Sequence, residues 1–170
     1  MPVCPYCGSE VIEGDDNCSE CSNSLADLHL PEPASDVERA LLADRVSVLD
    51  PKPAKTVTSD STIGDVLKQM HDQQIGCMLV VDDGKLNGIF SERDALLKLG
   101  AEVESKVNDP VSKYMTRSPQ TLAADAKVAF ALQRMDLGGY RHLPVLDENE
   151  TPTGVVSVRD ILRYLTRQLG

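Results

Sequence analysis

The chain lacks the features of a membrane or secreted protein. None of its apolar runs approaches the roughly 20 residues that a helix needs to cross a bilayer. The N-terminus, residues 1–4, has neither a basic residue nor an apolar stretch, so no secretory signal is expected. Four of the five cysteines lie within the first 21 residues, and the fifth is Cys77, whereas an oxidised secreted domain usually spreads an even number of cysteines through the chain. These absences predict a cytoplasmic protein that makes no membrane contact.

Positive charge is also scarce. The net charge of −10 disfavours broad binding to nucleic acid or to an anionic membrane surface. Residues 1–26 contain five acidic side chains and no Lys or Arg, whereas a surface that binds phosphate groups needs the opposite sign. Nucleic acid is therefore not expected as a partner. For residues 1–26 we expect protein docking or self-association.

Familiar catalytic motifs are missing as well. The sequence has no Gly-x-Gly-x-x-Gly, no Gly-x-x-x-x-Gly-Lys phosphate loop and no Gly-x-Ser-x-Gly nucleophile turn. We therefore expect no catalytic residues and a protein that is not an enzyme.

The cysteines form a pattern typical of a metal site. Their spacing is Cys4-x2-Cys7-x10-Cys18-x2-Cys21, and two Cys-x-x-Cys hooks can present four thiolates to one tetrahedral ion. Zn²⁺ is the expected ion, because soft thiolates in a small structural site favour it. Iron in a rubredoxin-like centre and a pair of disulfides are the alternatives. The pattern resembles a short zinc ribbon over residues 1–26, with a closed coordination shell and thus a structural role.

The rest of the chain repeats itself. Residues 88–94 read GIFSERD, and residues 154–160, which lie 66 positions later (160 − 94), read GVVSVRD. A period of this length indicates one supersecondary unit built twice, each copy supplying an apolar face for the other to bury. The polar residues Ser, Arg and Asp occur at the same positions in both copies of the motif. Function is therefore expected in the groove between the copies.

Each copy is predicted to have the order β-α-β-β-α. Copy one should contain strands at 55–57, 77–81 and 86–90, a helix capped by Asp60 or Ser61, and a second helix at 94–99. Copy two should contain strands at 120–122, 142–146 and 155–158, a helix from Asp125, and a final helix at 161–169. Ser35 with Glu38 forms a capping box that predicts a short helix to about residue 45. A turn at 13–17 and a proline-containing linker at 28–34 complete the prediction.

This order of elements resembles the cystathionine beta-synthase (CBS) domain, as do the Gly-apolar-apolar-Ser-x-x-Asp junction and the segment RHLPVLD at 141–147. Two such domains in tandem resemble a Bateman module. The implied fold class is α/β (α+β), with two CBS repeats packed as a pseudo-two-fold pair plus a small zinc-ribbon domain. The expected domains are 1–26 (ribbon), 27–44 (linker and short helix), 45–103 (first CBS domain) and 104–170 (second CBS domain). The resemblance also implies a homodimer.

Ser91 and Ser157 are expected where a strand meets a helix N-terminus. A hydroxyl and free backbone N–H groups at such a point can hold a phosphate or ribose oxygen. The carboxylates of Asp94 and Asp160, about one helical turn further on, can accept both hydroxyls of a ribose. The same residue types are also the usual helix caps at a junction of this kind. The repetition in both copies favours a ligand site.

The resemblance implies adenosyl ligands, namely AMP, ADP, ATP or S-adenosylmethionine. In the family, the Ser or Thr and the Asp contact ribose and phosphate. Basic residues on the buried strand of one copy reach the phosphate of a ligand held by the other copy. Arg141 and His142 match those basic positions, whereas copy one has Gly76 and Cys77 there. The copy-one cleft is therefore expected to be the tighter phosphate site.

Six further residues are candidates. Four residues lie on the strand that lines the base pocket in the family, two in each copy: Thr56, Val57, Thr121 and Leu122. The alternative is that they are ordinary core residues. Two arginines beside the motif either add phosphate contacts or lie on a solvated helix face: Arg93 and Arg159.

Together these features predict a non-catalytic sensor. It would bind an adenosyl nucleotide between its two CBS domains and signal to a protein partner, with a structural zinc ribbon for docking. A constitutive interaction scaffold whose clefts bind nothing is the first alternative. A transcription-linked regulator that acts through the ribbon is the second.

Overall fold

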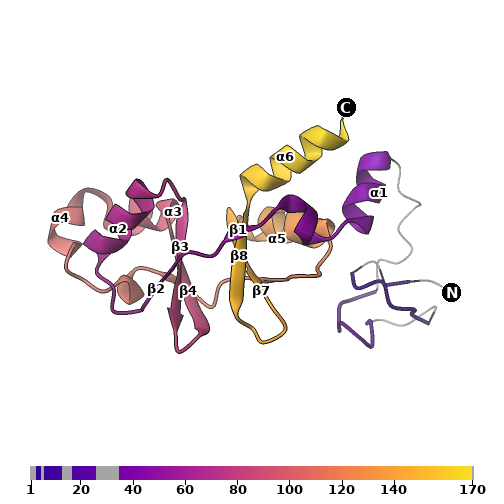
Figure 1. Ribbon diagram of the computed structural model, residues 1–170, viewed down its shortest axis with the longest axis horizontal. Coiled ribbons are helices and arrows are strands. Elements are labelled where there is room, and N and C mark those ends of the chain that lie inside the picture. The colour runs from indigo at the N-terminus through magenta and orange to yellow at the C-terminus, as the bar shows by residue number, and fades with distance from the viewer. Residues whose placement is uncertain (1–2, 5, 13–16, 26–34, 170) are drawn as a thin grey trace. The chain divides into compact units, whose positions relative to one another are not determined.

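The computed structural model describes residues 3–4, 6–12, 17–25 and 35–169 (Figure 1). The chain divides into two compact units, each built from segments that are far apart in the sequence. One comprises the chain up to Pro51, Leu122–Arg141 and the chain from Val156 onward, and the other comprises Lys52–Thr121 and His142–Val155. The predicted linker at 28–34, and the predicted turn at 13–17 except for its last residue, lie outside the described residues.

Along the described chain, pairs of consecutive strands alternate with helices. The α-helices are α1 Asp36–Ala43, α2 Ile63–Asp72, α3 Glu92–Asp94, α4 Val103–Lys106, α5 Val128–Gly138 and α6 Val158–Gln168. The strands are β1 Lys52–Pro53, β2 Thr56–Val57, β3 Cys77–Asp82, β4 Lys85–Ser91, β5 Thr116–Arg117, β6 Leu122–Ala123, β7 His142–Leu146 and β8 Pro152–Ser157. They form two four-stranded sheets, with the orders β2-β3-β4-β5 and β1-β8-β7-β6. This mixture of helices and sheets confirms the predicted fold class. Within the described part of the chain, no helix is long and apolar enough to span a membrane.

The first sheet and α2 enclose the core of copy one. Strand β2 runs parallel to β3, and β3 pairs antiparallel with β4. Helix α2 turns Ile63, Val66 and Met70 into this core, at the three-to-four-residue spacing of a single helix face. Phe90 on β4 is the largest fully buried side chain of the core. Its burial alone contributes about 1.5–3 kcal/mol to stability.

The predicted start of α2 is wrong by one or two residues. The helix begins after Thr62, whose hydroxyl accepts a hydrogen bond from the Asp65 N–H at 3.2 Å, and not after Asp60 or Ser61. The Ser61 hydroxyl is engaged in the preceding turn, where it accepts from the N–H of residue 58 at 3.2 Å. Sequence alone does not separate three adjacent capping residues, because each can serve either the turn or the helix.

The boundaries in copy two also differ from prediction. Helix α5 begins at Val128 and not at Asp125, because the residues before it form a turn. Arg45 donates to the Asp125 carbonyl oxygen at 2.7 Å, and the Val46 N–H donates to the Ala126 carbonyl oxygen at 2.7 Å. Strand β6 begins two residues later than predicted, at residue 122.

Helix α1 packs against both α5 and α6 within one unit. The predicted Ser35 cap is confirmed, since its hydroxyl accepts from the Glu38 N–H at 3.1 Å, and α1 ends at Ala43. The Tyr164 hydroxyl donates to the Asp44 carboxylate at 2.8 Å, which joins the end of α1 to the last helix.

The opposite face of the first sheet carries a second apolar cluster. Cys77, Leu79 and Ile89 are buried there, and the partly buried Val155 of β8 packs against them, whereas Met78 points into the copy-one core. This alternation is that of a strand buried on both faces. Cys77 is therefore a small core residue.

Gly88, the first residue of the repeated motif, permits a close approach of β5. A Cβ atom at position 88 would lie 2.5 Å from Sδ of Met115 and 3.0 Å from the Thr116 carbonyl oxygen. Strand β5 pairs at this point with β4, with Gly88 opposite Arg117. The missing side chain therefore lets β5 bring Thr116 up to the end of β4.

Candidate functional site

The four N-terminal cysteines converge on one point. Their Sγ atoms all lie within 4.8 Å of one another, with 3.6 Å between Cys4 and Cys21 and 3.6 Å between Cys7 and Cys18. A tetrahedral zinc ion with Zn–S bonds of about 2.3 Å would hold its sulfurs roughly 3.8 Å apart. All four are free thiols, so the alternative of two disulfides is not the arrangement observed. The sulfurs fit a four-thiolate metal centre.

Two matching turns hold these sulfurs. In the first hook, the Cys4 N–H donates to the Ser9 carbonyl oxygen at 2.8 Å, and the Gly8 N–H donates to the Cys4 carbonyl oxygen at 2.9 Å. In the second, the Ser22 N–H donates to the Cys18 carbonyl oxygen at 2.8 Å. Gly8 and Ser22 both adopt positive φ, +78° and +55°, and this left-handed conformation closes each turn. The same tight turn thus closes both hooks.

The thiols differ in how readily they ionise. The Ser9 hydroxyl, 3.4 Å from Sγ of Cys18, and nearby backbone N–H groups lower the pKa of Cys18 to about 6. The same hydroxyl lowers the pKa of Cys7, whereas burial raises the pKa of Cys4 to about 12. Metal ions bind the thiolate form, so an incoming ion must displace the proton of Cys4. Metal affinity is therefore expected to fall as the pH is lowered.

The two repeated junctions share one local structure. Ser91 and Ser157 are the N-caps of α3 and α6, which begin two and three residues earlier than predicted. The backbone N–H and the hydroxyl of each serine donate to one oxygen of the aspartate three residues on, at 2.9 and 2.6 Å for Asp94 and at 2.8 and 2.6 Å for Asp160. Both aspartates are buried, with exposed fractions of 8% and 2%. Each junction is thus a complete capping box.

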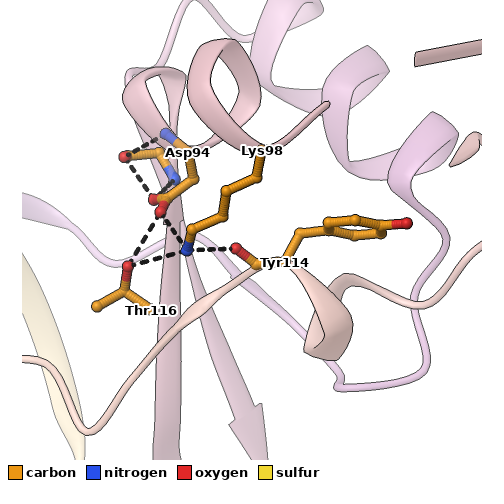
Figure 2. A network of polar contacts seen from close by, with 5 residues as sticks. Asp94, Lys98, Tyr114 and Thr116 are labelled. Carbon is orange, nitrogen blue, oxygen red and sulfur yellow. Dashed lines mark hydrogen bonds and ion pairs between the residues drawn. The ribbon is translucent and has the colours of Figure 1, made fainter. Parts of the chain in front are cut away.

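In copy one, the second oxygen of Asp94 joins a wider network (Figure 2). Lys98 Nζ lies 2.7 Å from Oδ1 of Asp94, and the Thr116 hydroxyl donates to the same oxygen at 3.0 Å. Lys98 also donates to the Tyr114 carbonyl oxygen at 2.7 Å. Burial raises the pKa of Asp94, but hydrogen bonds from Lys98, Ser91 and Thr116 outweigh it and hold that pKa below its ordinary value. The carboxylate is therefore ionised at neutral pH.

Among the described residues, no such wider network surrounds the aspartate of copy two. The second oxygen of Asp160 accepts from Arg163 at 3.0 Å, within the same helix. The residue that corresponds to Lys98 is Tyr164, 66 positions later, and it bonds to Asp44 instead. The backbones also diverge, since a π-helical turn covers residues 95–99 whereas α6 is α-helical throughout. Such turns are frequent at functional sites.

The other predicted ligand residues differ in exposure. Val57 and Leu122 are buried, and Val57 belongs to the copy-one core. Two residues are half-buried, Thr121 and His142, and four are exposed, Thr56, Arg93, Arg141 and Arg159. Their contacts with a ligand stay predictions.

His142 lies beside the copy-one junction, in the same compact unit. The Glu92 N–H, immediately after Ser91, donates to the Gly76 carbonyl oxygen at 3.0 Å. A Cβ atom at position 76 would lie 2.8 Å from Nε2 of His142 and 3.4 Å from Oε2 of Glu92. The imidazole thus occupies the space that a side chain at position 76 would fill. This geometry supports the predicted contribution of His142 to a copy-one ligand.

Replacing Gly76 with Ala is expected to displace His142 without unfolding the protein. The new methyl group meets the far end of a side chain that can turn aside, so the free energy of unfolding should change by less than about 1 kcal/mol. The affinity for AMP should fall about fivefold if one phosphate contact is lost. Calorimetric titration with AMP and with adenosine checks this. Equal losses for both ligands would show that His142 does not contact the phosphate.

Lys98 and Thr116 are residues that sequence reasoning missed. Lys98 follows Asp94 by four positions in a helical segment, which is a readable signal for an ion pair. Thr116 comes from a strand 22 positions further along the chain, and nothing local in the sequence connects it to Asp94.

Both repeats match a protein-family model described as the CBS domain, over residues 46–101 and 111–167. The chain belongs to the CBS-domain family. The predicted tandem pair of CBS domains is therefore confirmed.

Relatives of this CBS protein differ widely in length. An uncharacterised 17.7 kDa protein of Acidianus ambivalens is 33% identical over 134 residues, which are 76% of this chain and 80% of the relative. A CBS domain-containing protein of Arabidopsis thaliana is 31% identical over 162 residues, which are 95% of this chain but only 28% of that protein. The chain thus spans less than a third of the plant relative.

A solved structure of a CBS domain pair has the same fold. It was crystallised in complex with 5′-methylthioadenosine and S-adenosyl-L-methionine, and it matches with a TM-score of 0.64 and 25% identity. The match covers 74% of this chain and 98% of that one.

Proposed function

We propose that this CBS protein is a non-catalytic sensor of adenosyl ligands that signals to a protein partner. The observation that carries the proposal is the junction of serine and buried aspartate, which is built twice with the same hydrogen bonds. The related pair crystallised with S-adenosyl-L-methionine and 5′-methylthioadenosine supports an adenosyl ligand. AMP, ADP and ATP are the further candidates from the family resemblance.

The N-terminal cysteines are proposed to hold a structural Zn²⁺ ion. Four convergent sulfurs leave no open coordination position, so the ion would stabilise the module and carry out no reaction. The chain before Arg39 contains nine acidic side chains and no Lys or Arg, which favours docking to a protein with a basic surface. The domain limits 1–26, 27–44, 45–103 and 104–170, the homodimer and the cytoplasmic location belong to the same proposal.

A thermal-shift titration tests the sensor function. The zinc-loaded protein is melted with AMP, ADP, ATP, S-adenosylmethionine, 5′-methylthioadenosine and, as a control, GMP. A ligand at 100 times its dissociation constant stabilises the folded state by about 2.7 kcal/mol. For a chain of this size the melting temperature should then rise by roughly 5–10 °C. A response to adenosyl ligands and not to GMP is the expected result.

The second candidate function is a scaffold that binds no nucleotide. One observation favours it, namely that both oxygens of each aspartate already accept hydrogen bonds from the protein itself. A scaffold would show no shift with any of these ligands. The same titration therefore separates the two functions.

A further inference from the structure

The carboxylate of Asp94 has all of its acceptor positions occupied. An ionised carboxylate offers about four lone-pair positions, two on each oxygen. The N–H and the hydroxyl of Ser91 take Oδ2. Lys98 and the hydroxyl of Thr116 take Oδ1 (Figure 2). A ligand that bonds to Asp94 must therefore replace donors that are already present.

The four donors are not equally replaceable. The Ser91 N–H is fixed by the backbone at the start of α3, and the ammonium group of Lys98 is charged and also held by the Tyr114 carbonyl oxygen. Hydrogen bonds from a charged donor are roughly twice as strong as neutral ones. The other two donors are neutral hydroxyls, that of Ser91 on Oδ2 and that of Thr116 on Oδ1. Their oxygens also accept longer hydrogen bonds, from the Asp94 N–H and from Lys98, each at 3.3 Å. Each oxygen of Asp94 thus carries one fixed donor and one exchangeable hydroxyl.

We propose that, in the ligand-free protein, the Ser91 and Thr116 hydroxyls occupy the positions on Asp94 that the two hydroxyls of a ribose take on binding. Thr116 is then a specificity-determining residue of the copy-one site. The inference rests on the proposed sensor function, in which Asp94 accepts the two hydroxyls of a ribose, and adds Thr116 as the residue that competes with the ligand for one of those positions. On binding, each ligand hydroxyl takes the position that one protein hydroxyl leaves. Lys98 and the Ser91 N–H stay in place and keep the carboxylate fixed.

Copy two does not offer the same exchange. The second oxygen of Asp160 is bonded by the charged side chain of Arg163, and among the described residues only Ser157 supplies a hydroxyl to this carboxylate. A diol there would find one exchangeable hydroxyl instead of two. Recognition through a threonine is therefore a property of copy one alone.

The test replaces Thr116 and removes single hydroxyls from the ligand. Thr116→Val keeps the shape of the side chain and deletes the competing hydroxyl, and Thr116→Ser keeps the hydroxyl. Wild type and both variants are titrated by calorimetry with AMP, 5′-methylthioadenosine, 2′-deoxy-AMP and 3′-deoxy-AMP. Thr116→Val should bind AMP about fivefold more tightly, since one competing hydrogen bond is gone, and Thr116→Ser should bind like wild type. The gain should disappear with the deoxy ligand that lacks the hydroxyl replacing Thr116.

Each result decides the inference. A gain that is equal for AMP and both deoxy ligands would overturn it, because a general structural effect does not depend on a ligand hydroxyl. Unchanged or weaker AMP binding by a folded Thr116→Val protein would overturn it as well, while leaving the sensor function intact. If wild type binds neither AMP nor 5′-methylthioadenosine, the sensor function fails and the inference fails with it. Thr116→Ala serves the same test if Thr116→Val does not fold.

Discussion

Chelating the metal is expected to unfold the N-terminal module and to leave the CBS pair folded. Among the described residues of the module, the buried apolar side chains besides its cysteines are Val11 and Leu25, which is too small a core to fold alone. A four-thiolate zinc site contributes on the order of 10 kcal/mol to such a fold. Thiol-reactive dye should then label four cysteines rapidly after chelation and few or none before it.

Cys77 is the internal control for that experiment. It is 8% exposed, and burial raises its pKa to about 12, so it should stay unreactive with and without chelator while the CBS pair is folded. Cys18→Ser provides the matched variant, because it removes one ligand without touching the CBS repeats. Rapid labelling of all four N-terminal thiols before chelation would show that they hold no metal.

Asp94→Ala is expected to weaken AMP binding about 10- to 100-fold, and by more than Asp160→Ala does. The loss corresponds to one or two hydrogen bonds to a charged acceptor, each worth about 1.5 kcal/mol. The larger effect is placed at copy one because His142 lies beside that junction, against position 76 and Glu92. Calorimetric titration of both variants measures the difference.

Stability must be measured alongside, because Asp94 also caps α3. Its removal leaves Ser91, Lys98 and Thr116 without their shared acceptor, which should cost about 1–3 kcal/mol of unfolding free energy. Asp94→Asn keeps the size of the side chain and is the milder variant. Equal losses of affinity at Asp94 and Asp160 in folded proteins would rule out the proposed asymmetry between the copies.

The features that could be predicted from sequence are those that depend on residues close together in the chain. The Cys-x-x-Cys pairs indicated that the four cysteines converge, and the repeated motif indicated two junctions whose serines cap helices as expected. The strand at Cys77 was clear because a continuous apolar run between turn residues is typical of a buried strand. In each case the residues that decide the structure lie within a few positions of one another.

The features that could not be predicted depend on partners distant in the chain. Asp125 was expected to start a helix, but Arg45 engages its carbonyl oxygen from 80 positions away, and the helix begins later. Asp94 was expected to bind a ligand, but the hydroxyl of Thr116, brought close by the pairing of β5 with β4, already donates a hydrogen bond to its carboxylate. A local pattern identifies a group that can accept hydrogen bonds, and the tertiary fold decides which donors fill it.

Gly76 marks a position at which the two copies of the repeat have become different. The backbone contact at the junction is the same in both copies, since the N–H after the serine donates at 3.0 Å to the carbonyl oxygen of Gly76 in one and of Arg141 in the other. The side chains have diverged, and the space left at position 76 is filled by His142. A chain built from two identical second halves would force an arginine into that space. The two copies are therefore no longer equivalent. The imidazole of His142, from the second copy, completes the junction of the first copy, and exchanging the two copies in the chain would separate the two.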